Sequence, residues 1–454
     1  MFIDFLLDGF RAAGAKDALV WRDRVYPYSE LLDAVKGWQG RLVAEGVSAA
    51  SVVSLEADFS PASVALLLAL VEHRCIVVPL TASVETKKPE FREIAEVEVV
   101  VTLRGDDATF ERLRSPATHE LFARLRAAGH PGLVLFSSGS TGKSKAAVHD
   151  FAPLLEKFKV GRQAFRTISF LLFDHIGGVN TLLYTLSNAG CVVTVEDRDP
   201  DTVGAAIARH GVQLLPTSPT FINLLLLSEA YKRHDLGTLE MVTYGTEVMP
   251  ESTLQRFHRL FPGIRLLQTY GLSEVGILRS RSRSSDSLWV RIGGEGFQTR
   301  VADGMLEIKA ESAMLGYLNA PSPFTADGWF RTGDAVEVDG EWVRILGRKS
   351  EIINVGGEKV YPAEVESVLQ LMEGVEDVMV AAERSPITGQ LIRARVKLST
   401  SETPAEFGKR MRVFCQDKLP RVKVPQKVVI VSEAMHGGRF KKLRSDTPAG
   451  AERA

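Results

Sequence analysis

The sequence contains few cysteines, no long apolar run and almost no net charge. Cys75, Cys191 and Cys415 lie far apart and form no C-x-x-C pair, which argues against a zinc site or a disulfide framework and favours a reducing compartment. The longest apolar run near the start, residues 64–71, is far shorter than the roughly 20 residues that cross a bilayer. A net charge of −1 gives no overall attraction to nucleic acid or to an anionic membrane. Because the N-terminus also lacks the features of a secretory signal, we expect a cytoplasmic protein without a membrane span.

The order of the predicted elements indicates an α/β fold with more than one domain. The chain has 454 residues, beyond the roughly 250–300 at which a single core stops growing. Short apolar strands such as 51–55 alternate with amphipathic helices such as 62–73, a pattern typical of mainly parallel sheets covered by helices. From about residue 289 the strands alternate polar and apolar residues. An Asp-Gly turn between 335–338 and 342–346 predicts a hairpin in a β-rich subdomain.

The last hundred residues have the pattern of a smaller α+β domain. Predicted helices at 362–372 and 406–418 are interspersed with short strands. We therefore predict a large N-terminal domain at 1–347, a hinge at 348–351 and a small mobile C-terminal domain at 352–454.

A loop rich in hydroxyls, glycine and lysine follows an apolar strand at 133–136. It reads SSGSTGKSK over residues 137–145. Glycines allow backbone N–H groups to approach a phosphate closely, hydroxyls donate hydrogen bonds and lysines supply positive charge. A Walker A loop would need a glycine at position 137, where this chain has Ser137. It would also be followed by a helix, whereas residues 146–149 have the pattern of a strand. The loop therefore favours a polyphosphate site of another kind, although a solvated turn explains it equally well when it is taken alone.

Four further segments, together with this loop, resemble the adenylate-forming superfamily of acyl- and aryl-CoA synthetases, peptide-synthetase adenylation domains and beetle luciferases. The segments are QTYGLSE (268–274), GWFRTGD (328–334), GR (347–348) and INVGGEKVYPAEVE (353–366). The resemblance covers nearly the whole chain. It implies ATP-dependent activation of a fatty or aromatic carboxylic acid to an acyl-adenylate with release of pyrophosphate, followed by transfer to the thiol of coenzyme A.

The same resemblance leaves several other activities open. An acyl-AMP ligase that loads the phosphopantetheine of an acyl carrier protein would use the same adenylation residues. Lys418, Arg421, Lys423 and Lys427 could meet either the 3′-phosphate of coenzyme A or an acidic carrier helix. Amino-acid adenylation and a relative that only forms the thioester or only binds nucleotide are the minor alternatives. The run RSRSRSS at 279–285 is interpreted as an exposed strand or loop rather than as an RNA-binding segment.

The resemblance also implies a role for residues in each motif. The residues implied to bind the nucleotide are Ser137, Ser138, Gly139, Ser140, Thr141, Gly142, Lys143, Lys145, Gly245, Thr246, Glu247, Tyr270, Gly271, Ser273, Asp334 and Arg348. Thr141 and Glu274 would hold Mg²⁺, which prefers oxygen ligands and bridging phosphates. Tyr270 would stack on adenine, Asp334 would accept both ribose hydroxyls, and Arg348 would reach the ribose or the α-phosphate.

The acid is implied to bind in an apolar pocket beside the nucleotide. His175 occupies the position of a residue that gates this pocket in relatives, and Phe173, Phe221 and Tyr244 are candidate lining residues. Asp174, which precedes the gate, is the residue that would favour an amino acid as substrate. The apolar lining otherwise predicts an apolar acid.

The small domain is implied to serve the second half of the reaction. Ser350 aligns with the hinge residue about which this domain rotates in relatives. After rotation, Gly356, Gly357 and Lys359 would line the tunnel for pantetheine, because glycines admit the close approach of a ligand.

The main departure from the superfamily lies near the C-terminus, in MHGGRFKKLR at 435–444. Arg439 stands where relatives have the lysine that meets the carboxylate and the α-phosphate during adenylation, and Lys442 fits a basic position three residues further on. Arginine and lysine differ in shape and hydration, so the exchange is not neutral at a close-fitting site. We expect Arg439 or Lys442 to supply the catalytic cation, with Lys441 as a further candidate.

Overall fold

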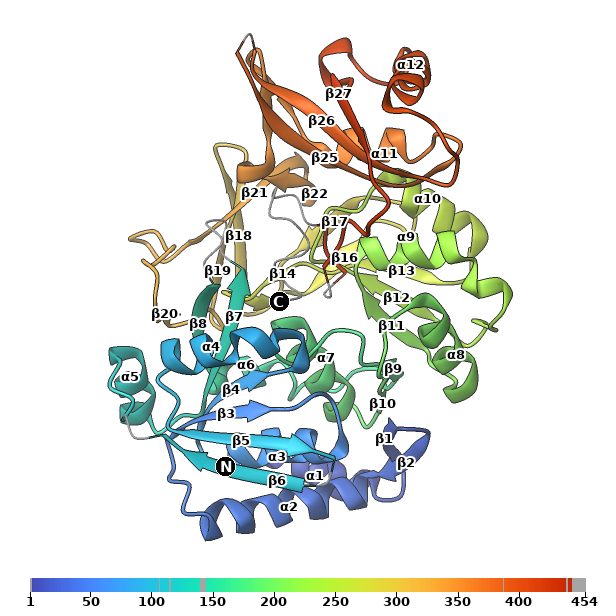
Figure 1. Cartoon of the computed structure of the whole chain (residues 1–454). Coiled ribbons are helices and arrows are strands. Elements are labelled where there is room, and N and C mark those ends of the chain that lie inside the picture. The colour runs from blue at the N-terminus through green and yellow to red at the C-terminus, as the bar shows by residue number, and fades with distance from the viewer. Residues whose placement is uncertain are drawn as a thin grey trace.

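The computed structural model describes residues 2–105, 107–113, 116–138, 144–386, 388–437 and 440–442, apart from the side chain of Ser138. Its elements form two large sheets covered by helices, an antiparallel sheet and a small α+β unit that lies at one end of the molecule (Figure 1). The predicted α/β class, with a large N-terminal part and a smaller C-terminal part, is confirmed. Within the described residues, no helix is both long enough and apolar enough to span a bilayer.

The first sheet has seven strands in the order β13-β12-β11-β9-β10-β1-β2, and only its last pair is antiparallel. The strands are β1 (Asp17–Trp21), β2 (Arg24–Pro27), β9 (Arg166–Ile168), β10 (Cys191–Val193), β11 (Leu214–Thr217), β12 (Met241–Tyr244) and β13 (Arg265–Gln268). The helical elements that follow β10 to β12 are α8 (Pro200–His210), α9 (Pro219–Ser228), η2 (Ala230–Lys232) and α10 (Glu251–Leu260). The alternation of short apolar strands with helices thus gives a mainly parallel sheet, as predicted.

The second sheet also has seven strands, in the order β20-β8-β7-β4-β3-β5-β6. They are β3 (Val52–Glu56), β4 (Ile76–Leu80), β5 (Val99–Arg104), β6 (Asp107–Arg112), β7 (Gly132–Ser138), β8 (Ser144–Asp150) and β20 (Gly316–Tyr317). The helical elements of this part are α1 (Asp4–Ala13), α2 (Tyr28–Ala44), α3 (Pro61–Glu72), η1 (Ala82–Lys87), α4 (Lys88–Ile94), α5 (Glu120–Ala128), α6 (Phe151–Glu156) and α7 (Ile176–Ser187). Strand β7 pairs antiparallel with β8, so the predicted phosphate loop joins two strands.

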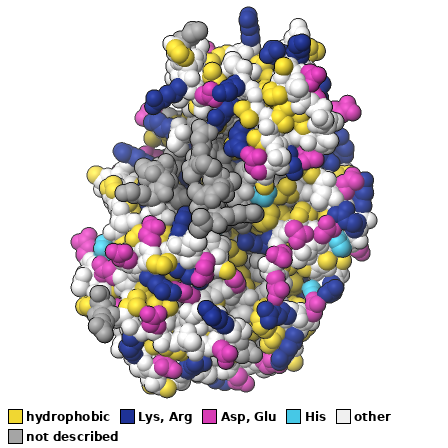
Figure 2. All heavy atoms as spheres, viewed as in Figure 1, with side chains coloured by type: hydrophobic (Ala, Val, Ile, Leu, Met, Phe, Trp, Pro, Cys, Tyr) yellow, Lys and Arg dark blue, Asp and Glu magenta, His cyan; other side chains and the backbone are white. Residues whose placement is uncertain are grey.

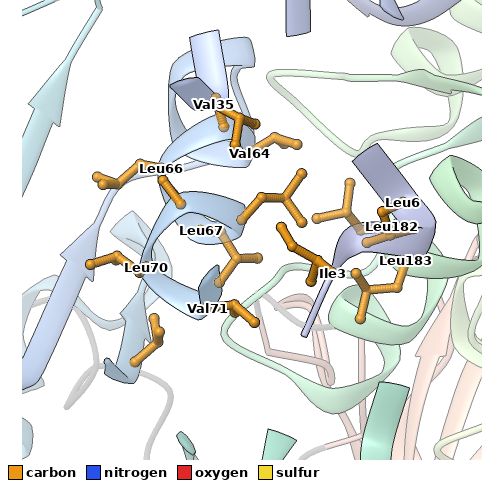
Figure 3. Packing of buried hydrophobic residues seen from close by; sticks show 14 of the residues in the cluster. Ile3, Leu6, Val35, Val64, Leu66, Leu67, Leu70, Val71, Leu182 and Leu183 are labelled. Carbon is orange, nitrogen blue, oxygen red and sulfur yellow. The ribbon is translucent and has the colours of Figure 1, made fainter. Parts of the chain in front are cut away.

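The largest hydrophobic core packs helix α3 against helices α1 and α7. Figure 3 shows Leu67 and Val71 of α3 beside Ile3 and Leu6 from the N-terminus and Leu182 of α7. All five side chains are buried. Helix α3 is apolar on every side, as expected for a helix enclosed between other elements. This core fixes the start of α7 and therefore the residues that precede it.

The third sheet is antiparallel and has six strands in the order β16-β17-β22-β21-β19-β18. They are β16 (Ser280–Ser282), β17 (Trp289–Ile292), β18 (Phe297–Ala302), β19 (Met305–Ala310), β21 (Phe330–Asp339) and β22 (Trp342–Arg348), and the hairpin β14 (Gly271–Leu272) and β15 (Gly276–Ile277) lies apart. The predicted hairpin is present as β21 and β22. The serine-rich run forms β16 and its flanks, where Ser282 and Ser285 accept hydrogen bonds from the backbone of β13.

The small unit contains a five-stranded sheet in which β26 is paired with β23, β25 and β27. Its elements are η3 (Lys349–Glu351), β23 (Ile353–Val355), β24 (Glu358–Val360), α11 (Pro362–Leu369), β25 (Val375–Ser385), β26 (Gly389–Leu398), α12 (Pro404–Cys415), η4 (Arg421–Lys423) and β27 (Lys427–Ile430). Both of its helices pack on a core of their own, with Val365, Leu369, Phe407 and Met411 buried. The segment that follows β27 runs back from this unit to the large one, as the dark red ribbon of Figure 1 shows.

Candidate active site

A cleft of about 640 Å³ lies where the sheets of the large unit meet the start of the small one. It falls within the size range of pockets that hold small molecules and cofactors. The sequence-predicted residues that line it are Ser137, Lys145, His175, Thr246, Gly271, Ser273, Glu274, Arg348 and Ser350. Residues that are more than two hundred positions apart in the chain thus share one cavity.

The charge of this cleft is strongly one-sided. Its described lining contains one carboxylate, that of Glu274, and six cationic side chains: Lys145, Arg198, Arg331, Arg348, Lys349 and Lys441. The face of the molecule in Figure 2, by contrast, has basic and acidic side chains interspersed. A concave site lined by cations attracts and holds a polyanion, even in a protein that is nearly neutral overall.

The phosphate loop is described only at its two ends. Ser137 pairs with Lys145 across the β7–β8 ladder, and both line the cleft. The ammonium of Lys145 lies 5.4 Å from the ring centre of Tyr317. Gly139, Ser140, Thr141, Gly142 and Lys143 lie outside the described residues, as does the side chain of Ser138, so their predicted contacts with phosphate and metal stay predictions.

Glu274 is held by residues that sequence reasoning missed. Its Oε1 accepts a hydrogen bond of 2.6 Å from the hydroxyl of Tyr317. Its backbone is fixed by the preceding residue, Ser273, whose carbonyl accepts a hydrogen bond of 2.5 Å from the buried His149. Burial lowers the pKa of His149 to about 4, so the imidazole is neutral at pH 7 and donates through Nε2. Nothing in the sequence marked Tyr317 or His149 as parts of the site.

The residues present fit one magnesium ion bridged to phosphate. A carboxylate oxygen in a cationic cleft is a hard donor, and Mg²⁺ commonly takes only one or two carboxylates from protein when phosphates supply the rest. No group of three or more His, Cys, Asp or Glu side chains suited to a metal occurs among the described residues. Glu274 alone therefore fits a shared metal site and does not form an all-protein one.

Asp334, Arg348 and Tyr270 form a linked set beside the cleft. Asp334 and Arg348 are paired across strands β21 and β22, and Arg348 Nε lies 3.5 Å from Asp334 Oδ1. The hydroxyl of Tyr270 donates to Asp334 Oδ2. Burial raises the pKa of Asp334, while the charge of Arg348 and the hydrogen bond from Tyr270 partly oppose this rise. The carboxylate is thus held in a fixed orientation, and it is buried next to the cleft rather than among the residues that line it.

The structure gives Tyr270 a different role from the one predicted. Its ring belongs to the core beneath the third sheet, with 7% of its surface exposed, and it is not among the cleft-lining residues. The ring packs with buried residues such as Val275 and Leu306, and its hydroxyl is engaged by Asp334. Tyr270 positions Asp334, and the expectation of stacking on adenine is not supported by this placement.

Glu247 points away from the cleft, contrary to the prediction that it binds nucleotide. Its Oε2 accepts a hydrogen bond of 2.6 Å from Thr220, and its Oε1 accepts one of 2.7 Å from the backbone N–H of Lys442. The side chain lines a separate small cavity. Thr246 turns toward the cleft with a left-handed backbone, φ 70°, and Gly245 is pressed against Thr269, whose carbonyl oxygen would lie 2.8 Å from an added Cβ.

Lys442 does not face the cleft. Its Nζ lies 3.1 Å from Glu366 Oε2 and 3.8 Å from Asp377 Oδ1, and it donates a hydrogen bond of 2.7 Å to the carbonyl of Val378. In an extended segment consecutive side chains point to opposite sides, so Lys441 is the residue that enters the cleft. Lys442 is therefore a structural anchor in this arrangement, and Arg439 lies outside the described residues.

Lys441 lies among the charges of the cleft. The surrounding protein and, next, the positive charge of Arg348 lower its pKa, whereas the nearby carboxylates of Glu247, Glu351 and Asp334 act in the opposite direction. Water reaches the side chain, but protein groups surround it on several sides. Of the described residues that follow β27, Lys441 is the cation that lies at the cleft.

The predicted acid pocket is only partly formed by the predicted residues. His175 lines the cleft and caps helix α7, since its Nδ1 accepts a hydrogen bond of 3.1 Å from Gly177. Phe173 lies in the core instead, with its ring edge-on to Phe59 at 4.9 Å, because its segment turns inward before α7. An apolar wall of the cleft is made by Phe170, Leu171 and Leu172, none of which had been predicted to line the pocket.

Phe221 and Tyr244 are buried behind that wall. They belong to one core cluster with Phe170, and the rings of Phe170 and Phe221 are 4.4 Å apart. Asp174 is also buried, and its Oδ2 accepts hydrogen bonds of 2.7 Å from Thr81 and 3.3 Å from Ser83. The contacts of Asp174 tie two loops together, and they give no support to recognition of an α-amino group.

The residues predicted for the pantetheine tunnel lie outside the cleft. Gly356 and Gly357 form the exposed turn between β23 and β24 with φ values of 59° and 96°, which glycine adopts without strain. Lys359 follows on β24 and is exposed. The basic residues Lys423 and Lys427 form ion pairs with Glu364 and Glu383.

Comparison with known proteins gives the family. The model of the AMP-binding enzyme family matches residues 82–302, and that of the AMP-binding enzyme C-terminal domain matches residues 364–441, together more than half of the chain. The chain belongs to the AMP-binding enzyme family. The resemblance seen in the sequence is therefore confirmed, and the protein is an enzyme of this family.

Several characterised relatives are similar along most of their length. The chain is 26% identical over 475 residues to an indoleacetate–CoA ligase of Aromatoleum aromaticum, with 92% of each chain covered. It is 24% identical over 452 residues to a 2-succinylbenzoate–CoA ligase of Listeria monocytogenes, with 93% of this chain and 94% of the relative covered. An anthranilate–CoA ligase in complex with anthranoyl-AMP has the same fold, with a TM-score of 0.80 at 19% identity over 97% of this chain and 95% of the other.

Proposed function

We propose that the protein is an ATP-dependent ligase that activates an apolar, aromatic carboxylic acid as its acyl-adenylate and transfers the acyl group to coenzyme A. The observation that carries this proposal is the composition of the cleft: one carboxylate among six cations, continuous with the apolar wall of Phe170, Leu171 and Leu172. Polyphosphate fits the cationic part and an apolar acid fits the wall. The relatives named above are ligases of indoleacetate and 2-succinylbenzoate, which supports an acid with a ring.

The residues of the cleft suit attack by a carboxylate on the α-phosphate of ATP. This reaction depends mainly on positioning and on neutralising charge that develops at the phosphorus. Asp334 would accept the ribose hydroxyls, Arg348 and Lys441 would face the α-phosphate and the attacking carboxylate, and Ser137 and Lys145 would meet the outer phosphates. Glu274 and the predicted Thr141 would hold Mg²⁺, which when bound would supply positive charge for the pyrophosphate oxygens.

The second half of the reaction requires the small unit to move. Gly356, Gly357 and Lys359 lie on an exposed turn away from the cleft, so a thiol could use them only after rotation. Ser350 lies in the short helix η3 between the two units and lines the cleft, which suits a hinge. We therefore keep 348–351 as the proposed hinge and 352–454 as the proposed mobile domain. The low cysteine content supports a cytoplasmic site of action.

The test is acid-dependent exchange of pyrophosphate into ATP, screened over aromatic, fatty and amino acids. Aromatic acids are expected to give the highest exchange, and addition of coenzyme A should then yield the thioester. Glu274→Gln should lower exchange by about 10²-fold or more, whereas Glu341→Gln, an exposed carboxylate paired with Arg291, should not. If none of the acids supported exchange, the proposal would be overturned. If the thioester formed only with a holo-carrier protein, that carrier would replace coenzyme A as the acceptor.

A further inference from the structure

The last described residues of the chain carry an aromatic ring from the small unit to the large one. We call residues 435–437 and 440–442 the hook. Lys442 fixes the hook to the small unit, because its Nζ is enclosed between Glu366 on α11 and the carbonyl of Val378 on β25. Figure 1 shows the segment after β27 descending from the small unit. The hook is therefore tied to the small unit by Lys442, while Phe440 touches the large unit.

Phe440 is the residue of the hook that packs on the large unit. Its ring centre lies 5.3 Å from that of Phe170 and 5.6 Å from that of Phe221, the latter edge-on. Its carbonyl accepts a hydrogen bond of 2.8 Å from Ser218, the cap of the helix on which Phe221 lies. The guanidinium of Arg198 lies 5.8 Å from the same ring. Phe440 is thus docked by its ring and by its backbone.

The backbone of Phe440 is held in a conformation that a bulky residue rarely adopts. Its φ of 51° lies in the left-handed region, where a Cβ is crowded by the chain. Such a conformation persists only where the surroundings determine it, and such positions are common at ligand sites. Stacking of His436 on the ring, at 5.3 Å and 18° between planes, adds a contact within the hook. The ring is therefore held against Phe170 and Phe221 although its backbone conformation is locally unfavourable.

The position of Phe440 bears on the acid pocket. Phe170, which it touches, begins the apolar wall of the cleft, and Lys441, the next residue, lines the cleft itself. Phe440 is not itself among the residues that line the cleft, and its ring backs Phe170 and the buried Phe221 from the side of the small unit. A larger acid that pushed past Phe170 would meet this ring.

We propose that Phe440 is a specificity-determining residue, which the small unit contributes to the acid pocket of the large unit and which limits the size of the acid that is adenylated. This inference rests on the proposed function and adds that acid selectivity is not contained in the large unit alone. Removing the ring should enlarge the pocket toward Phe221. Replacing Phe440 with the larger tryptophan should shorten the pocket.

The experiment compares benzoate with 2-naphthoate in the full-length Phe440→Ala, Phe440→Leu and Phe440→Trp variants. The ratio of kcat/KM in pyrophosphate exchange should shift toward naphthoate by about tenfold or more in Phe440→Ala, by less in Phe440→Leu, and toward benzoate in Phe440→Trp. Calorimetric binding of benzoyl- and naphthoyl-sulfamoyl adenosine should show the same order. Phe414→Ala, which truncates another half-buried aromatic residue of the small unit, should leave both ratios at the wild-type value.

The two readouts separate this inference from the proposed function. If none of the acids supports pyrophosphate exchange by the wild type, the proposed function fails. The ratio of the two binding constants still decides the role of Phe440. If the ratios in Phe440→Ala and Phe440→Leu stay within about twofold of the wild type, the ring does not limit the acid and the inference is wrong. If Phe440→Ala does not fold, Phe440→Leu, which keeps an apolar side chain at the wall, gives the decision.

Discussion

Two neighbouring lysines lie in environments of opposite kind. Lys442 belongs to a closed cluster with Glu366, Asp377 and the carbonyl of Val378, and its side chain is only 8% exposed. Lys441 belongs to an open cluster at the cleft, near Arg348 and Asp334, and its ammonium group forms no hydrogen bond or ion pair with other residues that the structure describes. The closed cluster neutralises its charges within the protein, whereas the open one leaves positive charge for a ligand.

The difference shows how one segment can serve two purposes. A buried ion pair adds little net stability over an apolar replacement of both partners, but the loss of one partner leaves an uncompensated charge. The closed cluster therefore fixes where the segment lies. The open cluster then gains a lysine whose position is set by its neighbour and whose charge is free for chemistry. Residue type alone does not separate the two roles, because both residues are lysine.

Breaking the closed cluster should have the largest effect on stability. Lys442→Met removes the cation that lies 3.1 Å from the carboxylate of Glu366, which is 1% exposed, and the free energy of unfolding should fall by about 3–5 kcal/mol. Denaturant unfolding followed by circular dichroism measures this loss. Lys441→Met is the matched control and should change stability by about 0.5 kcal/mol or less. The double variant Lys442→Met with Glu366→Gln should recover part of the loss, and equal losses for the two lysines would contradict the comparison.

Breaking the open cluster should instead lower the rate of the first chemical step, formation of the acyl-adenylate. Lys441→Met removes a cation from the place where charge develops, and pyrophosphate exchange should slow by about 10²–10³-fold. Lys427→Met, which removes a lysine paired with Glu383 on the small unit, should leave the rate unchanged. Arg439→Met tests the original expectation in the same assay. If Arg439→Met abolished exchange while Lys441→Met did not, the cation would be Arg439 and the assignment from the structure would be wrong.

A buried histidine that bonds the carbonyl of Ser273, next to Glu274, should make stability depend on pH. The pKa of His149 is about 4 in the folded protein, against 6.5 for the free side chain, because burial disfavours its charged form. The unfolded chain therefore binds more protons between these values, and stability should fall as the pH falls from 6.5 to 4, by up to about 3 kcal/mol. Unfolding at several pH values measures this slope.

A variant at the same position isolates this contribution. His149→Gln can still donate to the carbonyl of Ser273 but cannot take up a proton, so its slope over this pH range should be clearly smaller. His73→Gln, at a half-buried histidine that bonds the carbonyl of Val47, should keep the slope of the wild type because His149 is still present. An unchanged slope in His149→Gln would assign the pH dependence to other groups.

The sequence predicted the architecture well because its signals were local and repeated. Apolar strands alternating with helices indicated mainly parallel sheets, and the Asp-Gly turn correctly placed the hairpin of β21 and β22. The main residues of the cleft could also be predicted, since Ser137, Glu274 and Arg348 stand in motifs whose order is specific. These features depend on spacing along the chain, which can be read without coordinates.

The directions of side chains and their distant partners could not be predicted from the sequence in the same way. The register of an extended segment decides that Lys441 and not Lys442 faces the cleft, and a shift by one residue would reverse this. Glu247 was assigned to the nucleotide from its motif, but its direction is set by Thr220 and by the hook. Tyr317 lies on strand β20, which pairs with β8, and it bonds Glu274 from 43 residues away in the sequence. No local sequence pattern predicts such a partner.

The smallest expected effect sharpens the role of the open cluster in nucleotide binding. Tyr270→Phe removes the hydroxyl that donates to Asp334 and changes nothing else in the core. That hydrogen bond opposes the effect of burial, so its loss should raise the pKa of Asp334 further and leave the carboxylate less well oriented for a ribose. The KM for ATP should rise by about tenfold at neutral pH and by more at acidic pH, where protonated Asp334 is the weaker acceptor. Tyr361→Phe is the matched control, since this tyrosine lies beside the hinge at the start of α11 and should show neither change. A KM that rises equally at every pH would mean that Tyr270 acts through packing alone.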